Sequence, residues 1–313
     1  MSDKKVGIIT VHRNVNYGAN LQAFASCKFI NNSGYNAEVI DYYPKEMDKD
    51  NYLFSWLKLS YDNGKTKSLL HNMKLATALM LSAPIKNEKL KSFYSFREKY
   101  CKLSSKYVSF NDIANGEYTD VVCGSDQIWN PVITRGINPL YFGDISSVEN
   151  KISYAASLGR DKYNETDEQK VAELIKRMDY VSVREEKSIE YIKSISGKNV
   201  VGVCDPVFLL AKEEYEKIAK PIKVKKPYVL VYSVVNNAKM LSVAKDYADK
   251  NGLTLVEVCQ NKKRREKHIQ LSAASPEEFL GAIKDAQAVI TNSFHGTAFS
   301  LIFNKPFCFL LKS

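Results

Sequence analysis

The sequence has little histidine and no cysteine pair with metal-binding spacing. Four histidines occur among 313 residues, and none of the six cysteines forms a C-x-x-C pair. Zinc sites and disulfide frameworks usually show such spacings. We therefore expect no metal site and reduced thiols in a reducing compartment. Free cysteine often packs as a small apolar side chain, and that is the role we expect for most of these six.

Long apolar runs and glycine-rich nucleotide motifs are missing as well. No uninterrupted apolar run reaches about 18 residues, and an apolar run starts at Val6 without a preceding leader pattern. We expect a cytoplasmic protein without a membrane span or signal peptide. The first strand-to-helix turn has no G-x-G-x-x-G, and no G-x-x-x-x-G-K-[ST] occurs anywhere, which argues against dinucleotide and P-loop sites.

Acidic residues are outnumbered by basic ones. The formal net charge is +10, from 45 Lys and Arg against 35 Asp and Glu. Such an excess favours an anionic partner, whether a phosphate, a nucleic acid, an acidic glycan or a membrane surface. The one dense cluster, Lys262-Lys263-Arg264-Arg265, lacks interleaved aromatic residues. We interpret it as a solvated loop or helix end and expect no nucleic acid.

Short apolar runs alternate with longer amphipathic ones along most of the chain. Val6 to Val11, Ala19 to Asn31 and Ala37 to Tyr42 form a strand, helix and strand in succession. Such a βαβ unit indicates a parallel sheet. A second alternating series runs from Tyr228 to Leu310. The expected fold class is therefore α/β, with two Rossmann-like domains and mostly parallel sheets.

The irregular stretches set the expected domain limits. We place the N-terminal domain at 1–205, with a helical insertion at 44–115 that covers the first sheet, and a linker at 206–226. The C-terminal domain is placed at 227–313. The chain stops directly after its last expected strand, so we expect the C-terminus to be incomplete.

Polar residues follow the expected strands, where ligands bind in open α/β sheets. After the first strand, Asn16 and Gly18 could contact a sugar, and His12 and Arg13 would bring positive charge. The alternative is a capped turn with no ligand. After Cys123, Asp126 and Gln127 could bind hydroxyl groups. Trp129 could stack on a sugar ring, or it could be a buried wall residue.

Two basic residues stand at later strand-to-helix junctions. Arg184 follows an expected strand, and a guanidinium there can bind carboxylate or phosphate through two parallel hydrogen bonds. The alternative is a structural ion pair with Glu185 or Asp205. His295 lies at the last junction, where N–H groups at a helix start can bind an anion and imidazole can transfer a proton. Asn292, Ser293 and Gly296 surround it.

Six stretches in order resemble the polysaccharide pyruvyl transferase family and span nearly the whole chain. They are Gly7 to Thr10 with Asn16 to Ala23, Gly124 to Asn130, Ser153 to Ser157, Ser182 to Glu185, Asp205-Pro206 and Thr291 to Gly296. The resemblance implies two Rossmann-like domains facing across a cleft, as in GT-B glycosyltransferases. It implies transfer of pyruvate from phosphoenolpyruvate, a co-substrate rather than a cofactor, to two sugar hydroxyls as a cyclic ketal.

The resemblance also implies roles for particular residues. His295 would be the catalytic acid, and the donor side would comprise Arg184, Asn292, Ser293 and Gly296. Position at the strand ends and side-chain chemistry, rather than the resemblance, assign Asn16, Tyr17, Gly18, Asp126, Gln127 and Trp129 to the acceptor side. Some members carry Arg-Leu-His-Gly where this sequence has Ser293-Phe294-His295-Gly296. We expect His12 or Arg13 to compensate for that arginine.

Several functional hypotheses remain open at this point. Within the family, we expect a role in exopolysaccharide and cell-envelope biosynthesis, with a sugar or lipid-linked oligosaccharide as acceptor. A lipid-linked acceptor would bring the protein to the inner face of the membrane. The first alternative is a nucleotide-sugar glycosyltransferase of GT-B type, although no Glu-x₇-Glu spacing appears late in the second domain. The second is a non-catalytic module that binds a sugar or an anion.

Overall fold

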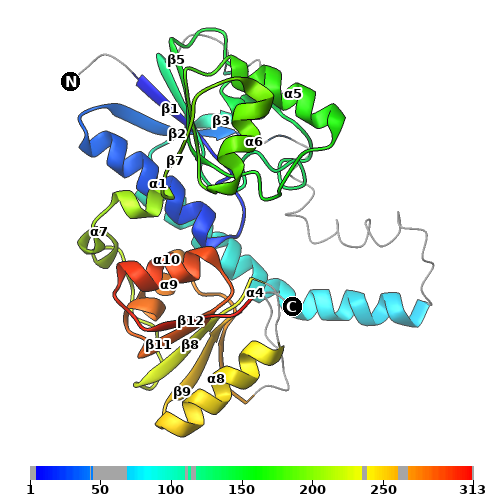
Figure 1. The fold of residues 1–313 in the computed structure, drawn as a ribbon. Helices are drawn as coiled ribbons and strands as arrows, with labels where there is room; N and C mark the ends of the chain where they lie inside the picture. The colour runs from blue at the N-terminus through cyan, green and yellow to red at the C-terminus, as the bar shows by residue number, and fades with distance from the viewer. Residues whose placement is uncertain are drawn as a thin grey trace. The chain divides into compact units, whose positions relative to one another are not determined.

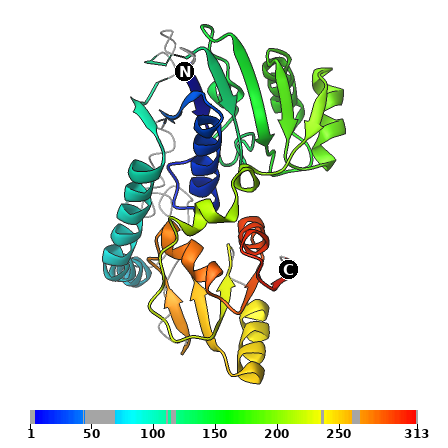
Figure 2. The ribbon, with the colours of Figure 1, turned by 90° about the vertical axis from the view of Figure 1, so that its left-hand side faces the viewer.

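The chain forms two compact α/β units, each built on its own sheet. The computed structural model describes residues 5–42, 44, 69–109, 112–113, 118–234, 238–259 and 267–311, with the backbone alone over 69–82. One unit comprises Met1–Ala76 and Arg97–Leu209, and the other comprises Thr77–Phe96 and Leu210–Ser313. Figures 1 and 2 show the helices flanking both sheets.

The first sheet has the strand order β3-β2-β1-β4-β5-β6-β7, and every pairing is parallel. The strands are β1 Lys5–Ile9, β2 Asn36–Tyr42, β3 Leu103–Tyr107, β4 Asp120–Cys123, β5 Asn150–Ala156, β6 Tyr180–Val183 and β7 Val200–Gly202. The helices are α1 Tyr17–Asn32, α4 Leu69–Tyr100, α5 Glu165–Lys176 and α6 Lys187–Ser196, with short 3₁₀ turns η2 Pro139–Phe142 and η3 Pro206–Leu209.

Both faces of the first sheet are buried. Ile9 and Cys123 belong to one apolar core together with Val171 and Ile175 of α5 and Ile192 of α6. Successive side chains of a strand point to opposite faces, so the fully buried Ile8 lies on the other face. Burial on both faces explains why these strands read as continuous apolar runs in the sequence.

The second sheet has the strand order β10-β9-β8-β11-β12, again with parallel pairing. Its strands are β8 Tyr228–Tyr232, β9 Thr254–Val258, β10 Ile269–Leu271, β11 Ala288–Thr291 and β12 Phe307–Phe309. The helices of this unit are α7 Lys212–Glu216, α8 Ala238–Asn251, α9 Pro276–Lys284 and α10 Phe294–Ile302.

Alternation along β8 assigns helices to the two faces of this sheet. Val229 and Val231 pack in one cluster with Met240 and Ala244 of α8. On the other face, the Tyr232 ring meets Phe279 of α9 edge-on at 4.8 Å, and the Tyr228 hydroxyl donates to the carbonyl of Ala282. The second sheet is therefore also covered on both sides, as Figure 2 shows.

The observed elements confirm the α/β class and the two parallel sheets. The sequence predicts strands at Asp120 to Cys123, Tyr180 to Val183 and Ala288 to Thr291, and these are the observed limits of β4, β6 and β11. The limits of β1, α1 and β2 differ from the expected ones by at most two positions. β3 and β10 were missed because Leu-Ser-Ser-Lys-Tyr is mostly polar and Ile-Gln-Leu is only three residues long. The expected linker at 206–226 contains η3 and α7, so it is structured.

The insertion differs from expectation. Residues 77–96 of α4 group with the second unit, whereas the prediction assigned all of 44–115 to the first sheet. Lys89 of this segment extends to the carbonyl of Cys259, just beyond β9. The Lys262 to Arg265 cluster lies outside the described residues.

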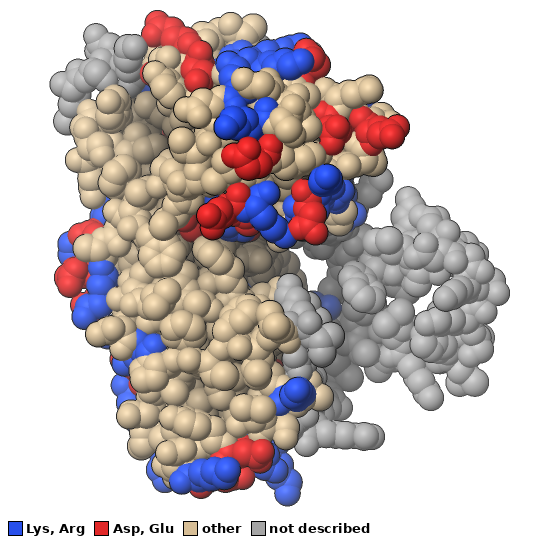
Figure 3. Space-filling view, in the orientation of Figure 1, with Lys and Arg blue, Asp and Glu red and all other residues tan. Residues whose placement is uncertain are grey.

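Charges of both signs are mixed on one face of the described part of the chain (Figure 3). On the face shown in Figure 3, lysine and arginine side chains of the first unit are interspersed with aspartate and glutamate side chains. The described residues therefore form no continuous basic patch on that face. None of the described helices combines the length and the apolar character that crossing a bilayer requires.

Gly281 lies where the chain segment at Lys220 packs against α9. A Cβ at this position would lie 1.8 Å from the backbone oxygen of Lys220, and the Lys220 amide donates to the carbonyl of Glu277 at 2.9 Å. Backbone thus packs directly against backbone, which no other residue type permits.

We predict that Gly281→Ala destabilises the second unit by about 3 kcal/mol, the upper range for overpacking a core. Gly202→Ala is the matched control, because its added Cβ meets only the end of the Ile189 side chain at 3.0 Å. Differential scanning calorimetry of both variants measures the effect. Equal melting temperatures for the two variants would contradict the assignment.

Candidate active site

Each sheet has one point where the chain changes direction between strands. In the first unit, β1 leads through α1 to β2 on one side, while β4 pairs with β1 on the other. In the second, β8 leads through α8 to β9, while β11 pairs with β8 on the other side. Open α/β sheets bind ligands beyond the strand ends at such switch points.

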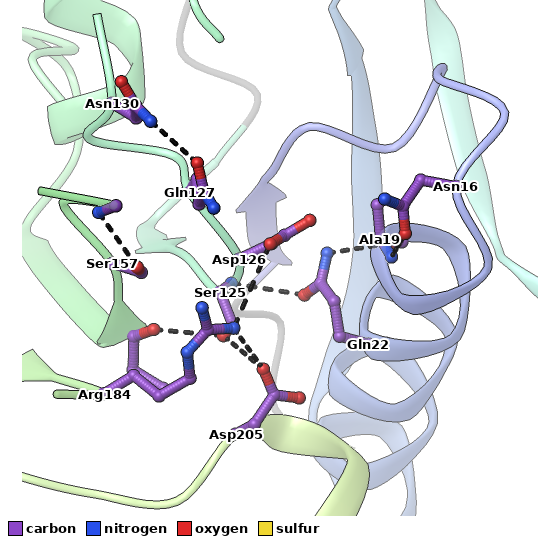
Figure 4. A network of polar contacts seen from close by, with 12 residues as sticks. Asn16, Ala19, Gln22, Ser125, Asp126, Gln127, Asn130, Ser157, Arg184 and Asp205 are labelled. Atoms are coloured by element: carbon purple, nitrogen blue, oxygen red, sulfur yellow. Dashed lines mark hydrogen bonds and ion pairs between the residues drawn. The ribbon is translucent and has the colours of Figure 1, made fainter. Parts of the chain in front are cut away.

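Ser125 is the centre of a hydrogen-bond network at the switch point of the first sheet (Figure 4). The Thr10 hydroxyl donates to the carbonyl of Ser125 at 3.2 Å, and Gln22 Nε2 donates to that hydroxyl at 2.7 Å. The Ser125 amide donates back to Gln22 Oε1. Ser125 Oγ lies 2.9 Å from Asp205 Oδ2 and 3.0 Å from the carbonyl of Ala155. The ends of β1, β4 and β5 are thereby fixed together.

The backbone around Ser125 is constrained. Gly124 has φ +127°, and a Cβ there would lie 2.2 Å from the carbonyl oxygen of Tyr154. Asp126 and Ala155 have φ values of 62° and 53°, in the left-handed region of backbone conformation that residues other than glycine rarely adopt. Such residues cluster at functional sites, where the surrounding contacts hold them in place.

Arg184 is held by carboxylates. Its Nη1 donates to Asp205 Oδ2 at 2.9 Å, its Nε donates to Glu185 Oε1 at 3.1 Å, and Asp126 Oδ1 lies 4.0 Å away. Burial disfavours the charge, but the nearby carboxylates outweigh it and raise the pKa of Arg184 above its usual value. The side chain is 10% exposed. An incoming anion would meet these three carboxylates, so the geometry favours the structural ion pair over donor binding.

The Gly124 to Asn130 loop divides into buried and partly exposed residues. Asp126 and Gln127 are partly exposed, and Gln127 Oε1 accepts from Asn130 Nδ2 at 2.7 Å. Trp129 is 1% exposed, donates to the carbonyl of Tyr141 and stacks on Phe142 at 5.2 Å. The hypothesis that Trp129 stacks on a sugar is wrong, because its ring is enclosed by the core.

The β1–α1 turn is mainly structural. Asn16 caps α1, since its side chain accepts from the amide of Ala19 at 3.1 Å. Tyr17 is 3% exposed and Gly18 is buried. Acceptor contacts by Tyr17 and Gly18 are therefore excluded in this conformation, and Asn16 fits the alternative of a capped turn.

His12 and Arg13 are engaged by one buried carboxylate. His12 Nδ1 lies 3.0 Å from the carbonyl of Thr10, and its Nε2 lies 2.9 Å from Asp41 Oδ1. Arg13 donates from Nε and Nη2 to the two oxygens of Asp41. This arrangement favours a structural role over the compensating donor contact that the sequence suggested.

The carboxyl group of Asp41 responds to these partners. Burial alone would raise its pKa, but hydrogen bonds and charge from Arg13 and His12 more than reverse that effect. The pKa of Asp41 therefore lies well below its usual range, and its ionised form belongs to the folded state.

The switch point of the second sheet contains His295. Thr291 Oγ1 donates to the carbonyl of Tyr232 at 2.7 Å and accepts from the amide of Ser293 at 3.0 Å. Ser293 is the N-cap of α10, and its hydroxyl accepts from the amide of Gly296. His295 lies in the first turn of this helix and is 7% exposed. The sequence thus placed His295 correctly at a strand-to-helix junction.

The neighbours of His295 mainly shape the junction. Asn292 Oδ1 accepts from the amide of Val234 at 3.1 Å, which ties the loop after β11 to the loop after β8. A Cβ on Gly296 would lie 2.3 Å from Thr291 Oγ1. Gly296 therefore allows α10 to pack closely on β11.

Sequence reasoning missed several residues of these networks. Gln22 and Ser125 are ordinary polar residues, although a buried glutamine inside an apolar helix face such as that of α1 is a usable signal. Asp41 is the next-to-last residue of an expected strand and has no motif around it. Lys89 is buried, and its Nζ lies 3.4 Å from the carbonyl of Cys259; burial lowers its pKa.

The sequence model of the family described as "Polysaccharide pyruvyl transferase" matches residues 16–311. The chain belongs to this family, a family of transferases. The match covers both switch-point networks almost completely. No curated protein matches the sequence of this family member.

Solved structures with a similar fold have little sequence identity to this pyruvyl transferase family member. The complex of MnaA from S. aureus with UDP matches 98% of this chain and 79% of its own, with a TM-score of 0.51 and 14% identity. A protein assigned as a UDP-N-acetylglucosamine 2-epimerase from Listeria monocytogenes matches 99% and 80%, with a TM-score of 0.50 and 9% identity. These likenesses support a GT-B-like fold class and carry no conclusion about substrate.

We predict that Asp205→Asn lowers the free energy of unfolding by about 3 kcal/mol, because it removes the nearest and most buried of the three charge partners of Arg184. Asp144→Asn is the control, since its pair with Arg177 is largely exposed and contributes at most about 1 kcal/mol. Urea denaturation measures both changes. A cost for Asp205→Asn as small as the control would contradict a central role for this pair.

The shifted pKa of Asp41 predicts a pH dependence. A carboxyl whose pKa is lower when folded stabilises the protein fully above its unfolded value of about 3.9, and this stabilisation is lost as pH falls through the folded value. The stability difference between the natural protein and Asp41→Asn should therefore be largest at pH 6–7. It should shrink by about 1.4 kcal/mol per pH unit below about pH 4. A difference independent of pH in denaturation curves would refute the ion pair.

Proposed function

We propose that this protein transfers pyruvate from phosphoenolpyruvate to two hydroxyl groups of a sugar, forming a cyclic ketal in cell-surface polysaccharide biosynthesis. Membership of the family supports the reaction class. The observation that carries the proposal is the position of His295, in the first turn of α10 at the switch point of the second sheet. The donor, the acceptor and the role of each residue are proposals.

The start of α10 suits an anionic donor. The first N–H groups of a helix have no acceptor within the helix, and the helix dipole favours negative charge there. The Ser293 hydroxyl accepts from Gly296, so this side chain organises the turn. Phosphoenolpyruvate carries a carboxylate and a phosphate, either of which fits such a terminus.

In the proposed reaction, the His295 imidazolium gives its proton to the methylene carbon of phosphoenolpyruvate, which becomes a methyl group. Positive charge develops at the adjacent carbon, and a sugar hydroxyl adds there and releases its proton. The second hydroxyl then displaces phosphate by breaking the bond between that carbon and oxygen, and releases a second proton. One proton restores the imidazolium and the other leaves with phosphate. Such proton transfers contribute about 10²–10⁴-fold in rate.

Asp126 and Gln127 are the proposed acceptor-binding residues. Asp126 and Gln127 have partly exposed side chains at a strand end, and both can bind hydroxyl groups. We assign Arg184 a positioning role, because it holds Asp205 and Glu185 and lies beside Asp126. A sugar carried on a lipid diphosphate would bring the protein to the cytoplasmic face of the membrane, and a soluble acceptor would not.

We predict that His295→Ala reduces turnover by at least about 100-fold while the protein remains folded, since the general acid is lost. Leu301→Ala, an exposed residue of the same helix, is the control and should keep full activity. Mass spectrometry of a candidate glycan incubated with phosphoenolpyruvate detects the ketal, and phosphate release gives the rate. Full activity of His295→Ala would remove His295 from the mechanism.

A thermal-shift experiment separates the alternative functions. Phosphoenolpyruvate at 100 times its dissociation constant should stabilise the protein by about 2.7 kcal/mol. Stabilisation by a nucleotide sugar and not by phosphoenolpyruvate would favour a glycosyltransferase. Stabilisation by phosphoenolpyruvate or a glycan without any ketal product would favour a binding module.

A further inference from the structure

A cavity of about 410 Å³ lies at the carboxyl edge of the first sheet. It is lined by Gly159, Arg160 and Asp161, which follow β5, and by Glu185 and Lys187, which follow β6. Its volume falls in the range of pockets that hold small molecules. None of these five residues was a candidate ligand-binding residue from the sequence, where Glu185 was named only as a partner of Arg184 and as part of a matching stretch.

Two residues of the cavity wall carry polar atoms that the described protein does not satisfy. Glu185 Oε2 and Arg160 Nε are both buried and have no hydrogen-bond partner among the described residues. A buried acceptor or donor without a partner is unfavourable. The Glu185 side chain as a whole is 29% exposed, so part of it faces solvent at the cavity.

The rest of the wall is held in place. Glu185 Oε1 accepts from the Ser157 hydroxyl at 2.7 Å and from Arg184 Nε at 3.1 Å. Arg160 Nη2 donates to Asn130 Oδ1 at 3.2 Å. Such contacts orient side chains before a ligand arrives, which reduces the entropy lost on binding.

Gly159 keeps the wall compact. Its φ is +64°, and a Cβ would lie 2.5 Å from Gln127 Oε1 and 2.6 Å from Asn130 Nδ2. The Gly124 to Asn130 loop thus packs directly against the cavity wall. A chain of hydrogen bonds links the cavity wall to the Ser125 network. Arg184 donates to Glu185 in the wall and to Asp205, and the Ser125 hydroxyl donates to Asp205 as well.

The charges of the lining define the ligand class. Arg160 and Lys187 are basic and Asp161 and Glu185 are acidic, so the formal charges cancel, and Lys187 is paired with Asp161. A bound anion would gain little from such a wall. A carboxylate accepts from hydroxyl groups and a guanidinium N–H donates to them, so the side chains of Glu185 and Arg160 are both suited to binding hydroxyl groups.

We infer that this cavity is a subsite for a neutral sugar residue, bound through hydroxyl groups by Glu185 and Arg160. This inference rests on the proposed function in one respect, that the acceptor is a sugar. Beyond the proposed function, the inference locates one sugar unit beyond the ends of β5 and β6. It also names the two side chains that bind the hydroxyl groups of this unit.

The test measures sugar binding without phosphoenolpyruvate. The intact chain is titrated, with saturation-transfer NMR, against methyl glycosides of glucose, galactose, mannose and N-acetylglucosamine. We expect at least one to bind, and Arg160→Met to weaken that binding about tenfold, as expected for a lost hydrogen bond to a charged group. Arg177→Met, an exposed arginine of the same unit, is the matched control and should bind as the natural protein does.

Circular dichroism and the melting temperature show whether Arg160→Met is folded, and Arg160→Lys provides a second variant that keeps the charge but loses Nε–H. Both variants should bind the glycoside more weakly. The inference is overturned if no glycoside binds, if both variants bind it as the natural protein does, or if inorganic phosphate competes for the cavity. Ketal formation is measured separately. Sugar binding that depends on Arg160 without ketal formation would refute the proposed reaction and leave the subsite intact.

Discussion

The buried contact between Asp205 and Arg184 is the interaction on which the candidate site of the first unit depends. Asp205 follows the last strand of the sheet, and it meets Ser125 from the end of β4 and Arg184 from the end of β6. Two charges removed from water are stable only when both are paired and hydrogen-bonded. The strand ends must therefore keep their register, and the Gly124–Asp126 backbone is held in its unusual conformation by the same contacts.

The two units share one organising rule. In each, the chain leaves a central strand toward one side of the sheet, and a later strand adds on the other side. Two loops at the carboxyl end are consequently not separated by a crossover helix, and polar side chains can meet there. Thr10 and Ser125 meet in the first unit, and Asn292 and Val234 meet in the second. His295 owes its position to this topology as well as to its own helix.

Acidic side chains pair with several of the basic side chains in this strongly basic sequence. His12, Arg13 and Arg184 are the basic residues that motifs bring to the first sheet, and Asp41, Asp205 and Glu185 engage all three. Positive charge in the sequence thus did not identify basic side chains that lack an acidic partner at this sheet. The helix start around His295 depends on backbone dipoles, and the cavity beside Arg160 has balanced charges, so the two places suit different ligands.

The sequence by itself determined the α/β class, most strand and helix limits, and the junction position of His295, because apolar periodicity and turn residues are local properties. It also brought together the six stretches that resemble the family. Tertiary structure decided which polar residues are available. Trp129 and Tyr17 are enclosed by the core, and Arg184 is neutralised by residues up to 58 positions away in the sequence. Strand order and side-chain burial arise from long-range packing, which no local pattern encodes, and that packing also formed the cavity at Arg160 and Glu185.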